Sequence, residues 1–266
     1  GISFSIKYGE CFGIVGESGS GKSTTGYNII GIYDVTSGKI LYKGEELPSN
    51  IRKRSKTMKK EIQMVFQDPG GSLNPKKSIK QIITLPLKVH NIVSKDQYQE
   101  KISEIFNMVG LPFDYSERYP LTLGGGERQL VAVARALATD PEFIVLDEPT
   151  SALDVSMQAT VIQTLMRLQK ELNLTYLFIT HNLSLMRNIA SRVAIMYLGK
   201  IVEVAPTDEF FNNPLHPYTK MLLSSIPVLT DEEEALKPEK IISQGEIPSP
   251  INPPSGCYFH PRCTFK

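Results

Sequence analysis

The sequence has few cysteines, no marked excess of charge and no long apolar run, and each lack excludes a class of protein. Three cysteines in 266 residues are too few for a disulfide framework and favour a reducing compartment. The 29 basic and 28 acidic residues leave a formal net charge of +1, so charge alone does not favour a nucleic acid or an acidic substrate. No stretch approaches the roughly 18 consecutive apolar residues of a membrane-spanning helix. We therefore expect a cytoplasmic protein that reaches any membrane through a partner.

What the chain does contain is a series of short apolar runs separated by helical patterns, which predicts the α/β class. An amphipathic helix at about 155–172 separates two of the runs, so they are expected to be parallel buried strands joined by a crossover. A hairpin is expected at 192–204, around Gly199. Strands are predicted at residues 2–6, 11–15, 39–41, 62–66, 143–146 and 176–179.

Proline spacing and composition divide the chain further. Residues 68–135 are predicted to be mainly helical, in segments punctuated by prolines. The basic stretch 51–60 lacks interleaved aromatic residues and is expected to be a solvated helix face. After Pro206 the prolines become frequent, which predicts a loop-rich appendage at 206–266.

A glycine-rich segment, Gly16-Glu17-Ser18-Gly19-Ser20-Gly21-Lys22-Ser23, fits the phosphate-loop pattern. It follows a predicted strand and opens a predicted helix, where backbone N–H groups can surround phosphate oxygens. Lys22 is predicted to bridge the β and γ phosphates, and Ser23 to bind Mg²⁺. This segment predicts a nucleotide site.

Polar residues follow three of the predicted strands, at the edge where open α/β sheets bind ligands. Asp147 and Glu148 follow one strand; Asp147 is predicted to hold Mg²⁺, through water, and Glu148 to polarise the attacking water as general base. His181 follows another and is predicted to contact the γ phosphate or the water. Gln67 follows a third and is predicted to contact both Mg²⁺ and the water.

Taken together, these motifs resemble the ABC transporter ATPase family: Walker A at 16–23, the Q-loop at Gln67, a signature at 123–127, Walker B at 143–148 and a switch histidine at His181. A D-loop at 151–154 completes the set. The resemblance implies a P-loop NTPase (RecA-like) core at 1–67 and 136–205, a helical signature subdomain at 68–135 and the appendage at 206–266.

The resemblance also implies which residues bind nucleotide. Two such subunits pair head to tail, and each ATP lies between the Walker A of one and the signature of the other. Asp154, with Ser151, is expected at the dimer seam, and Leu123, Gly124, Gly125, Gly126 and Glu127 are expected to face the partner's nucleotide. ATP and Mg²⁺ are the implied cofactors, with Ser23, Gln67 and Asp147 around the metal. The implied nucleotide-binding residues are Gly16, Ser18, Gly19, Ser20, Gly21, Lys22, Ser23, Thr24, Gln67, Asp147, Glu148 and His181.

The signature departs from the family's usual Leu-Ser-Gly-Gly-Gln at two positions. Gly124 replaces the serine, so a hydroxyl donor is lost, and Glu127 replaces the glutamine and adds negative charge. Losing one charge-assisted hydrogen bond removes roughly 1.5–3 kcal/mol. We therefore expect an impaired site in trans and an asymmetric heterodimer; simple tolerance of the change, or an engineered substitution, is the alternative.

Several segments resemble the oligopeptide/dipeptide branch of the family. They are Val65 to Pro69 with Ser72 to Pro75, Ser151 to Gln158, His216 to Thr219, and Pro253 to Cys263. Peptide import is the expected function, and nickel or glutathione import is the alternative, because those importers share much of this tail. Two other classes stay open: a soluble non-transport ABC ATPase, and a regulatory module that binds ATP without turnover.

The branch also implies partners and a location. The expected partners are a second ABC ATPase subunit, transmembrane permease subunits and an extracytoplasmic substrate-binding protein, with no nucleic acid. The chain is expected to be peripheral on the cytoplasmic face of the membrane. The family's adenine-stacking aromatic residue is expected upstream of this sequence, because Lys22 lies too near the first residue and Tyr8 is too close to the loop.

The two tail cysteines are a candidate for an incomplete metal or iron–sulfur site. Cys257 and Cys263 flank His260, but such clusters usually need four ligands. Cys11, in a predicted buried strand, is expected to be a small core residue.

Overall fold

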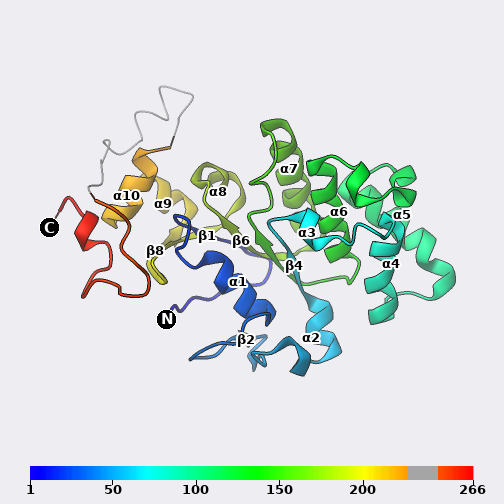
Figure 1. Cartoon of the computed structure of the whole chain (residues 1–266), viewed down its shortest axis with the longest axis horizontal. Helices are drawn as coiled ribbons and strands as arrows, with labels where there is room; N and C mark the ends of the chain where they lie inside the picture. The colour runs from blue at the N-terminus through cyan, green and yellow to red at the C-terminus, as the bar shows by residue number, and fades with distance from the viewer. Residues whose placement is uncertain (227–244, 266) are drawn as a thin grey trace. The chain divides into compact units, whose positions relative to one another are not determined.

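The computed structural model describes residues 1–226 and 245–265, so part of the predicted appendage, residues 227–244, lies outside the described residues. Helices and strands alternate along the chain (Figure 1), which confirms the α/β class. Strand β1 (Cys11–Val15) and helix α7 (Val155–Leu172) have the bounds that the sequence predicts.

The described residues pack as two compact units. The first unit contains residues 1–6, 11–25 and the chain from 178 onward, and the second contains residues 7–10 and 26–177. Helix α1 (Lys22–Ile30) continues from the first unit into the second, and strand β6 (Thr175–Thr180) from the second into the first. The domain ranges expected from the sequence stay a prediction.

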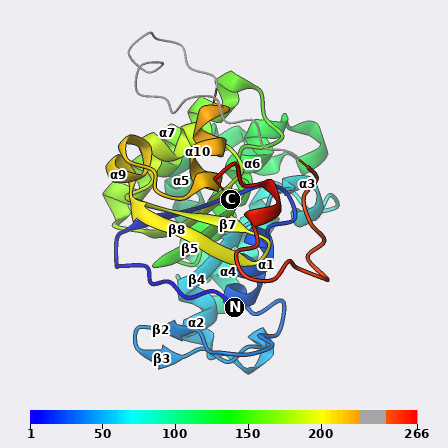
Figure 2. The same ribbon diagram turned by 90° about the vertical axis from the view of Figure 1, so that its left-hand side faces the viewer.

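The first unit is built around β1 and a hairpin. Strand β1 pairs in parallel with β7 (Arg192–Tyr197). Strand β7 pairs antiparallel with β8 (Lys200–Pro206), and Figure 2 shows these two strands side by side. Leu198 and Gly199 join β7 to β8 with φ angles of 44° and 76°. A two-residue turn with positive φ at both positions matches the twist of the strands it joins. The predicted hairpin is therefore confirmed.

Buried apolar residues give this unit its core. All five residues of β1 are buried, as is most of β7, because both strands are apolar runs rather than alternating ones.

A short 3-10 turn lies at His260–Arg262. Among the described residues, the unit also contains the helices α8 (Leu183–Ile189), α9 (Thr207–Asn212) and α10 (Pro217–Ser224).

Residues 2–6 form no strand, so that part of the sequence prediction is wrong. Their exposure does alternate along the segment, as predicted. The contacts that hold the segment, however, use side chains: Phe4 stacks on Phe12 at 5.2 Å, and Arg192 donates to the backbone oxygen of Ser5 at 3.2 Å. The exposure of these residues alternates because one side of the segment packs against the rest of the unit, although the segment does not pair with a neighbouring strand.

The second unit contains a parallel pair of strands and most of the helices. Strand β4 (Ile62–Val65) pairs with β5 (Phe143–Asp147). A short hairpin joins β2 (Leu41–Tyr42) to β3 (Glu45–Glu46), so only the last residue of the predicted strand at 39–41 is in a strand. Apart from α7, the helices that lie wholly in this unit are α2 (Lys56–Glu61), α3 (Pro69–Ser72), α4 (Ile79–His90), α5 (Tyr98–Val109) and α6 (Gly125–Leu137).

Local signals explain where these helices begin and end. Helix α4 starts with a capping box between Ser78 and Gln81 and is followed by Asn91, which has a left-handed backbone. Helix α7 is capped at its start by Asp154, whose carboxylate accepts from the N–H of Met157, and is followed by the left-handed Asn173. The mainly helical nature of 68–135 is confirmed.

Candidate nucleotide-binding and catalytic site

The phosphate loop, Gly16 to Ser23, lies in the first unit between β1 and the first turn of α1. Gly19 and Gly21 have φ angles of 78° and 102°, which residues with side chains rarely adopt. A Cβ on Gly16 would lie 2.1 Å from the backbone oxygen of Met196, so a larger residue cannot approach β7 this closely. These glycines therefore set the path of the loop.

Lys22 and Ser20 are buried polar residues of the loop. Lys22 is buried, and its ammonium group donates to the carbonyl oxygens of Gly16 and Glu17 at 2.8 and 3.0 Å. The Ser20 hydroxyl is also buried and has no hydrogen-bond partner among the described residues. A buried cation and an unsatisfied hydroxyl at a helix start suit an anion. These residues therefore fit a nucleotide phosphate.

The other predicted residues of the loop differ in exposure. Ser18, Gly19 and Thr24 are exposed, whereas Ser23, the second residue of α1, is half-buried. Part of the loop is therefore accessible to a ligand at the start of α1.

Two carboxylates mark the end of β5 in the second unit. Asp147 is its last residue and is fully buried. Burial raises the pKa of Tyr27, and the nearby carboxylate of Asp147 raises it further. A buried carboxylate is stable only with donors or a cation near it, so Asp147 fits the predicted Mg²⁺ site.

Glu148 follows Asp147 in an unusual backbone conformation. Its φ is 44°, in the left-handed region, which costs a non-glycine residue roughly 1–3 kcal/mol and is often found at functional sites. The side-chain amide of Gln67 donates to a carboxylate oxygen of Glu148 at 3.2 Å. The structure thus brings together two of the residues predicted to handle the attacking water.

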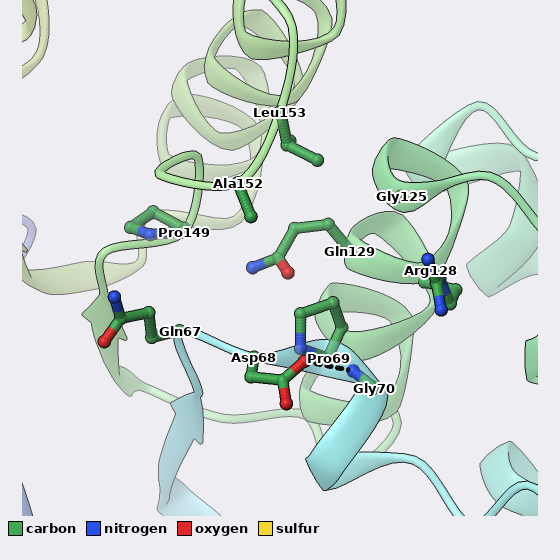
Figure 3. A pocket seen from close by; sticks show the side chains of 10 residues that line it. All are labelled: Gln67, Asp68, Pro69, Gly70, Gly125, Arg128, Gln129, Pro149, Ala152 and Leu153. Carbon is green, nitrogen blue, oxygen red and sulfur yellow. Dashed lines mark hydrogen bonds between the residues drawn. The ribbon is translucent and has the colours of Figure 1, made fainter.

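Gln67 also leads into a cavity of about 100 Å³ in the second unit (Figure 3). Figure 3 shows the Gln129 side chain pointing into the group of residues that lines it. Gln129 is 1% exposed, and its amide nitrogen has no hydrogen-bond partner in the described part of the chain. The lining residues are Gln67, Asp68, Pro69, Gly70, Gly125, Arg128, Gln129, Pro149, Ala152 and Leu153.

His181 lies in the first unit, directly after β6, and its side chain is exposed. The backbone around it is fixed on both sides. The N–H of Asn182 donates to the Thr180 hydroxyl at 3.0 Å, and the Asn182 side chain caps α8. The structure therefore presents the imidazole at the carboxyl end of a buried strand.

The signature residues lie at the start of α6 in the second unit. Leu123 is buried, and Gly124 is the residue before the first turn of the helix. Glu127 accepts from the N–H of Gly124 at 2.8 Å and from the hydroxyl of Tyr115 at 3.0 Å. The carboxylate of Glu127, which replaces the family's glutamine, therefore caps the helix to which it belongs.

The signature packs directly against the D-loop. A Cβ on Gly126 would lie 2.1 Å from the terminal carbon of Met157, and one on Gly125 would lie 3.4 Å from Leu153. Ser151 donates to the backbone oxygen of Glu148 at 3.2 Å, and Asp154 begins α7. The two segments predicted to face a partner subunit are thus neighbours in this unit.

The predicted residues therefore fall into two groups. The phosphate loop and His181 lie in the first unit, and Gln67, Asp147, Glu148 and the signature lie in the second. Their assembly around one nucleotide stays a prediction.

Comparison with known families decides the class of protein. The family model described as ABC transporter matches residues 1–151, more than half of the chain. The chain belongs to the ABC transporter family. A second model, described as the oligopeptide/dipeptide transporter C-terminal region, matches residues 202–266 of this ABC protein.

Similar proteins agree with this assignment. The chain is 52% identical over 265 residues to the oligopeptide transport ATP-binding protein AppF of Bacillus subtilis (strain 168), covering 99% of the chain and 80% of AppF. It is 45% identical over 263 residues to the dipeptide transport ATP-binding protein DppF of Escherichia coli (strain K12), covering 99% and 78%. A solved dimer of the ATP-binding cassette MJ0796, in a post-hydrolysis state with ADP and Pi, has a TM-score of 0.68 and 28% identity, covering 77% of this chain and 89% of that one. The P-loop NTPase fold expected for an ABC ATPase is confirmed.

The three cysteines of this ABC protein differ in their exposure. Cys11 is buried, as expected, Cys257 is exposed and Cys263 is partly buried. Among the described residues, no group of three or more His, Cys, Asp or Glu side chains is placed to hold a metal ion. Nor is any helix within those residues long and apolar enough to cross a membrane.

Sequence reasoning missed three residues of the ABC core and tail that meet in the structure: Glu17, Tyr218 and Arg262. Glu17 is one of the variable positions of the phosphate-loop pattern, so the pattern assigns it no role. Tyr218 and Arg262 lie in the two tail motifs that identify the branch, and that was the available signal.

Proposed function

We propose that this chain is the ATP-binding and ATP-hydrolysing subunit of a peptide importer. One observation carries the proposal: a phosphate loop with a buried lysine and a C-terminal region of the oligopeptide/dipeptide type occur in the same unit. The names of the most similar relatives, which specify oligopeptides or dipeptides, favour peptides over nickel or glutathione. The soluble non-transport alternative has no comparable support.

In this proposal, the residues of the loop bind ATP and the residues after β5 activate water. Lys22 contacts the β and γ phosphates, and Ser18, Gly19, Ser20, Gly21 and Thr24 surround them with backbone N–H and hydroxyl groups. Ser23, Gln67 and Asp147 would hold Mg²⁺, which would supply positive charge to the phosphates. The buried Asp147 and the unsatisfied Ser20 hydroxyl support this arrangement.

Glu148 is proposed as the general base. It polarises the attacking water, while the amide of Gln67 orients its carboxylate and His181 contacts the γ phosphate. Its strained backbone and its hydrogen bond to Gln67 support this role, because both restrict where the carboxylate points.

The partners follow from the signature and the D-loop. We propose a second ABC ATPase subunit that pairs head to tail with this one, so that Leu123 to Glu127 reach the partner's nucleotide and Ser151 and Asp154 lie at the seam. The dimeric MJ0796 cassette and the close packing of Gly126 against Met157 support this pairing. A different partner ATPase, with an intact signature, completes an asymmetric heterodimer.

We further propose that membrane permeases anchor this subunit at the cytoplasmic face, with an extracytoplasmic protein that delivers peptide. The cavity beside Gln67 supports a docking place for a permease helix, because it opens between the Q-loop segment and α6. An iron–sulfur cluster is not part of the proposal, since Cys257 and Cys263 lack further ligands among the described residues.

Reconstituted transport tests the function. The chain, its partner ATPase, the permeases and the binding protein are placed in lipid vesicles, and ATP hydrolysis is measured with di- to pentapeptides, nickel or glutathione. Peptides are expected to raise hydrolysis and to enter the vesicles. Stimulation by nickel or glutathione alone would contradict the peptide assignment.

The Glu148→Gln variant tests the catalytic assignment in the same assay. Removing a general base lowers turnover by at least about 100-fold, and ATP binding should persist because the amide keeps the shape of the side chain. Glu142→Gln is the matched control, since Glu142 lies just before β5 and pairs with Lys43 at 2.7 Å. Full activity of Glu148→Gln would refute the assignment.

A further inference from the structure

Glu17 is the one acidic residue of the phosphate loop, and the C-terminal tail binds it from two directions. Arg262 donates from its two terminal nitrogens to the two carboxylate oxygens of Glu17, at 2.8 and 3.1 Å. The side chains are 8% exposed for Arg262 and 26% exposed for Glu17. Paired, partly buried arginine–carboxylate contacts are among the stronger and more directional polar interactions. All these residues lie in the first unit.

The Tyr218 hydroxyl binds both the backbone N–H and the side-chain carboxylate of Glu17. It accepts from the N–H of Glu17 at 3.1 Å and lies 3.2 Å from a carboxylate oxygen, to which it donates. Tyr218 is fully buried on α10, and burial raises its pKa, so it stays a neutral donor. The contact therefore fixes the loop backbone at Glu17 as well as its carboxylate.

Two aromatic rings hold the side chain of Arg262 in place. The guanidinium lies 5.9 Å from the ring of Tyr197 and 5.8 Å from that of Phe259. These rings pack with Tyr218, with centroids 4.7 Å apart for Tyr197 and 5.2 Å for Phe259. Cation–π contacts and ring packing hold the arginine before any ligand arrives.

Charge gives the contact a consequence for ATP. A free carboxylate in a loop that surrounds phosphates repels them, whereas a carboxylate paired with arginine does not. We propose that Arg262 and Tyr218 are positioning residues for ATP binding: they neutralise Glu17 and hold the phosphate loop in its binding shape. This inference rests on the proposed function only in that the loop binds ATP. The C-terminal region thus sets the affinity of the loop for nucleotide.

Nucleotide binding to the full chain tests the inference. Arg262→Ala is expected to weaken binding of a fluorescent ATP analogue by at least about tenfold, because it leaves the Glu17 carboxylate unpaired. Adding Glu17→Gln to Arg262→Ala should restore most of the affinity, since it removes the unpaired charge. Tyr218→Phe keeps the ring packing and should weaken binding by a smaller factor. In the assembled ATPase, KM for ATP should rise while kcat stays within about twofold.

Lys200→Ala is the matched control. Lys200 lies over the ring of the tail residue Tyr258 at 5.7 Å, so its removal takes a cation from a tail contact without touching the Glu17 group. Thermal unfolding of each variant separates folding from binding. Wild-type affinity in Arg262→Ala, or no rescue by Glu17→Gln, overturns the inference. Failure of the wild-type chain to bind the analogue overturns the proposed function instead.

Discussion

At the scale of single residues, the signature shows how a departure from a family pattern can have a local cause. Glu127 carries negative charge where the family has glutamine, and this charge was expected to harm the site. In the structure, the carboxylate binds the Gly124 N–H and the Tyr115 hydroxyl at the start of α6. Acidic residues are favourable there because they interact with the helix dipole. The missing hydroxyl at 124 is therefore the departure that matters more.

Gly124→Ser is expected to raise ATP hydrolysis by the assembled transporter about tenfold, because it restores a donor to the partner's nucleotide. The new side chain fits: a Cβ at this position would lie 3.5 Å from the nearest atom, a carboxylate oxygen of Glu127. Turnover at saturating ATP checks the expectation.

Gly124→Ala adds the same Cβ without the hydroxyl and is the control for Gly124→Ser. Equal rates for the wild type and both variants would show that the site tolerates glycine. Such a result would also remove the argument for an asymmetric heterodimer.

The candidate residues differ in how far the sequence could predict them. Lys22, Glu148 and Gln67 belong to short patterns beside apolar strands, so local spacing was sufficient to find them. The contact of Gln67 with Glu148 required the fold, because the two residues follow different strands, β4 and β5, which pair with each other. No local pattern pairs Glu17 with Arg262, so that contact could not be predicted.

At the scale of elements, helix α7 shows one residue with two separable properties. Asp154 caps α7 by accepting from Met157 at 2.9 Å, and it is predicted to lie at the dimer seam. Capping needs only a side-chain acceptor, whereas a charged seam contact needs the carboxylate. The two properties therefore respond differently to asparagine.

Asp154→Ala is expected to lower the free energy of unfolding by about 1 kcal/mol, because the helix start loses its cap, whereas Asp154→Asn should be close to neutral. Urea unfolding measures both. If the carboxylate acts at the seam, Asp154→Asn will still weaken ATP-dependent pairing with the partner subunit, measured by sedimentation. Wild-type pairing by Asp154→Asn would restrict the residue to capping.

The elements were predictable where one local signal dominated. The period of apolar residues gave the bounds of α7, and a continuous apolar run gave β1. The strand predicted at residues 2–6 was wrong because side-chain packing produces alternating exposure just as strand pairing does. Strand β2 was placed too early because its two residues are exposed or half-buried, so burial left no pattern to locate it.

At the scale of the whole molecule, buried phenols limit stability at high pH. Burial raises the pKa of Tyr218 and of Tyr42, and the nearby carboxylate of Glu61 raises the pKa of Tyr42 further. A phenol whose pKa is raised in the folded state stabilises the fold fully below its unfolded pKa of about 10. This contribution is lost as pH rises towards the folded pKa.

The free energy of unfolding should therefore fall above about pH 10, by up to about 1.4 kcal/mol per pH unit for each such tyrosine. Tyr218→Phe is expected to be less stable than the wild type at pH 8 but to lose less stability between pH 10 and 11. Urea unfolding at each pH measures this.

Tyr8→Phe is the control for the alkaline series, because Tyr8 is 69% exposed. It should follow the wild-type curve throughout. An unchanged alkaline slope in Tyr218→Phe would show that this phenol does not titrate with unfolding.

The ion pair between Glu17 and Arg262 also affects the order in which the chain can form its contacts during synthesis. The two residues are 245 positions apart in the chain. The ribosome makes Glu17 well before Arg262, so the ion pair can form only after the intervening residues have been made. Contacts with such long separations form late, because the chain entropy lost in closing the loop must be overcome first. The phosphate loop therefore gains its contact with Arg262 only after the C-terminal region has been made.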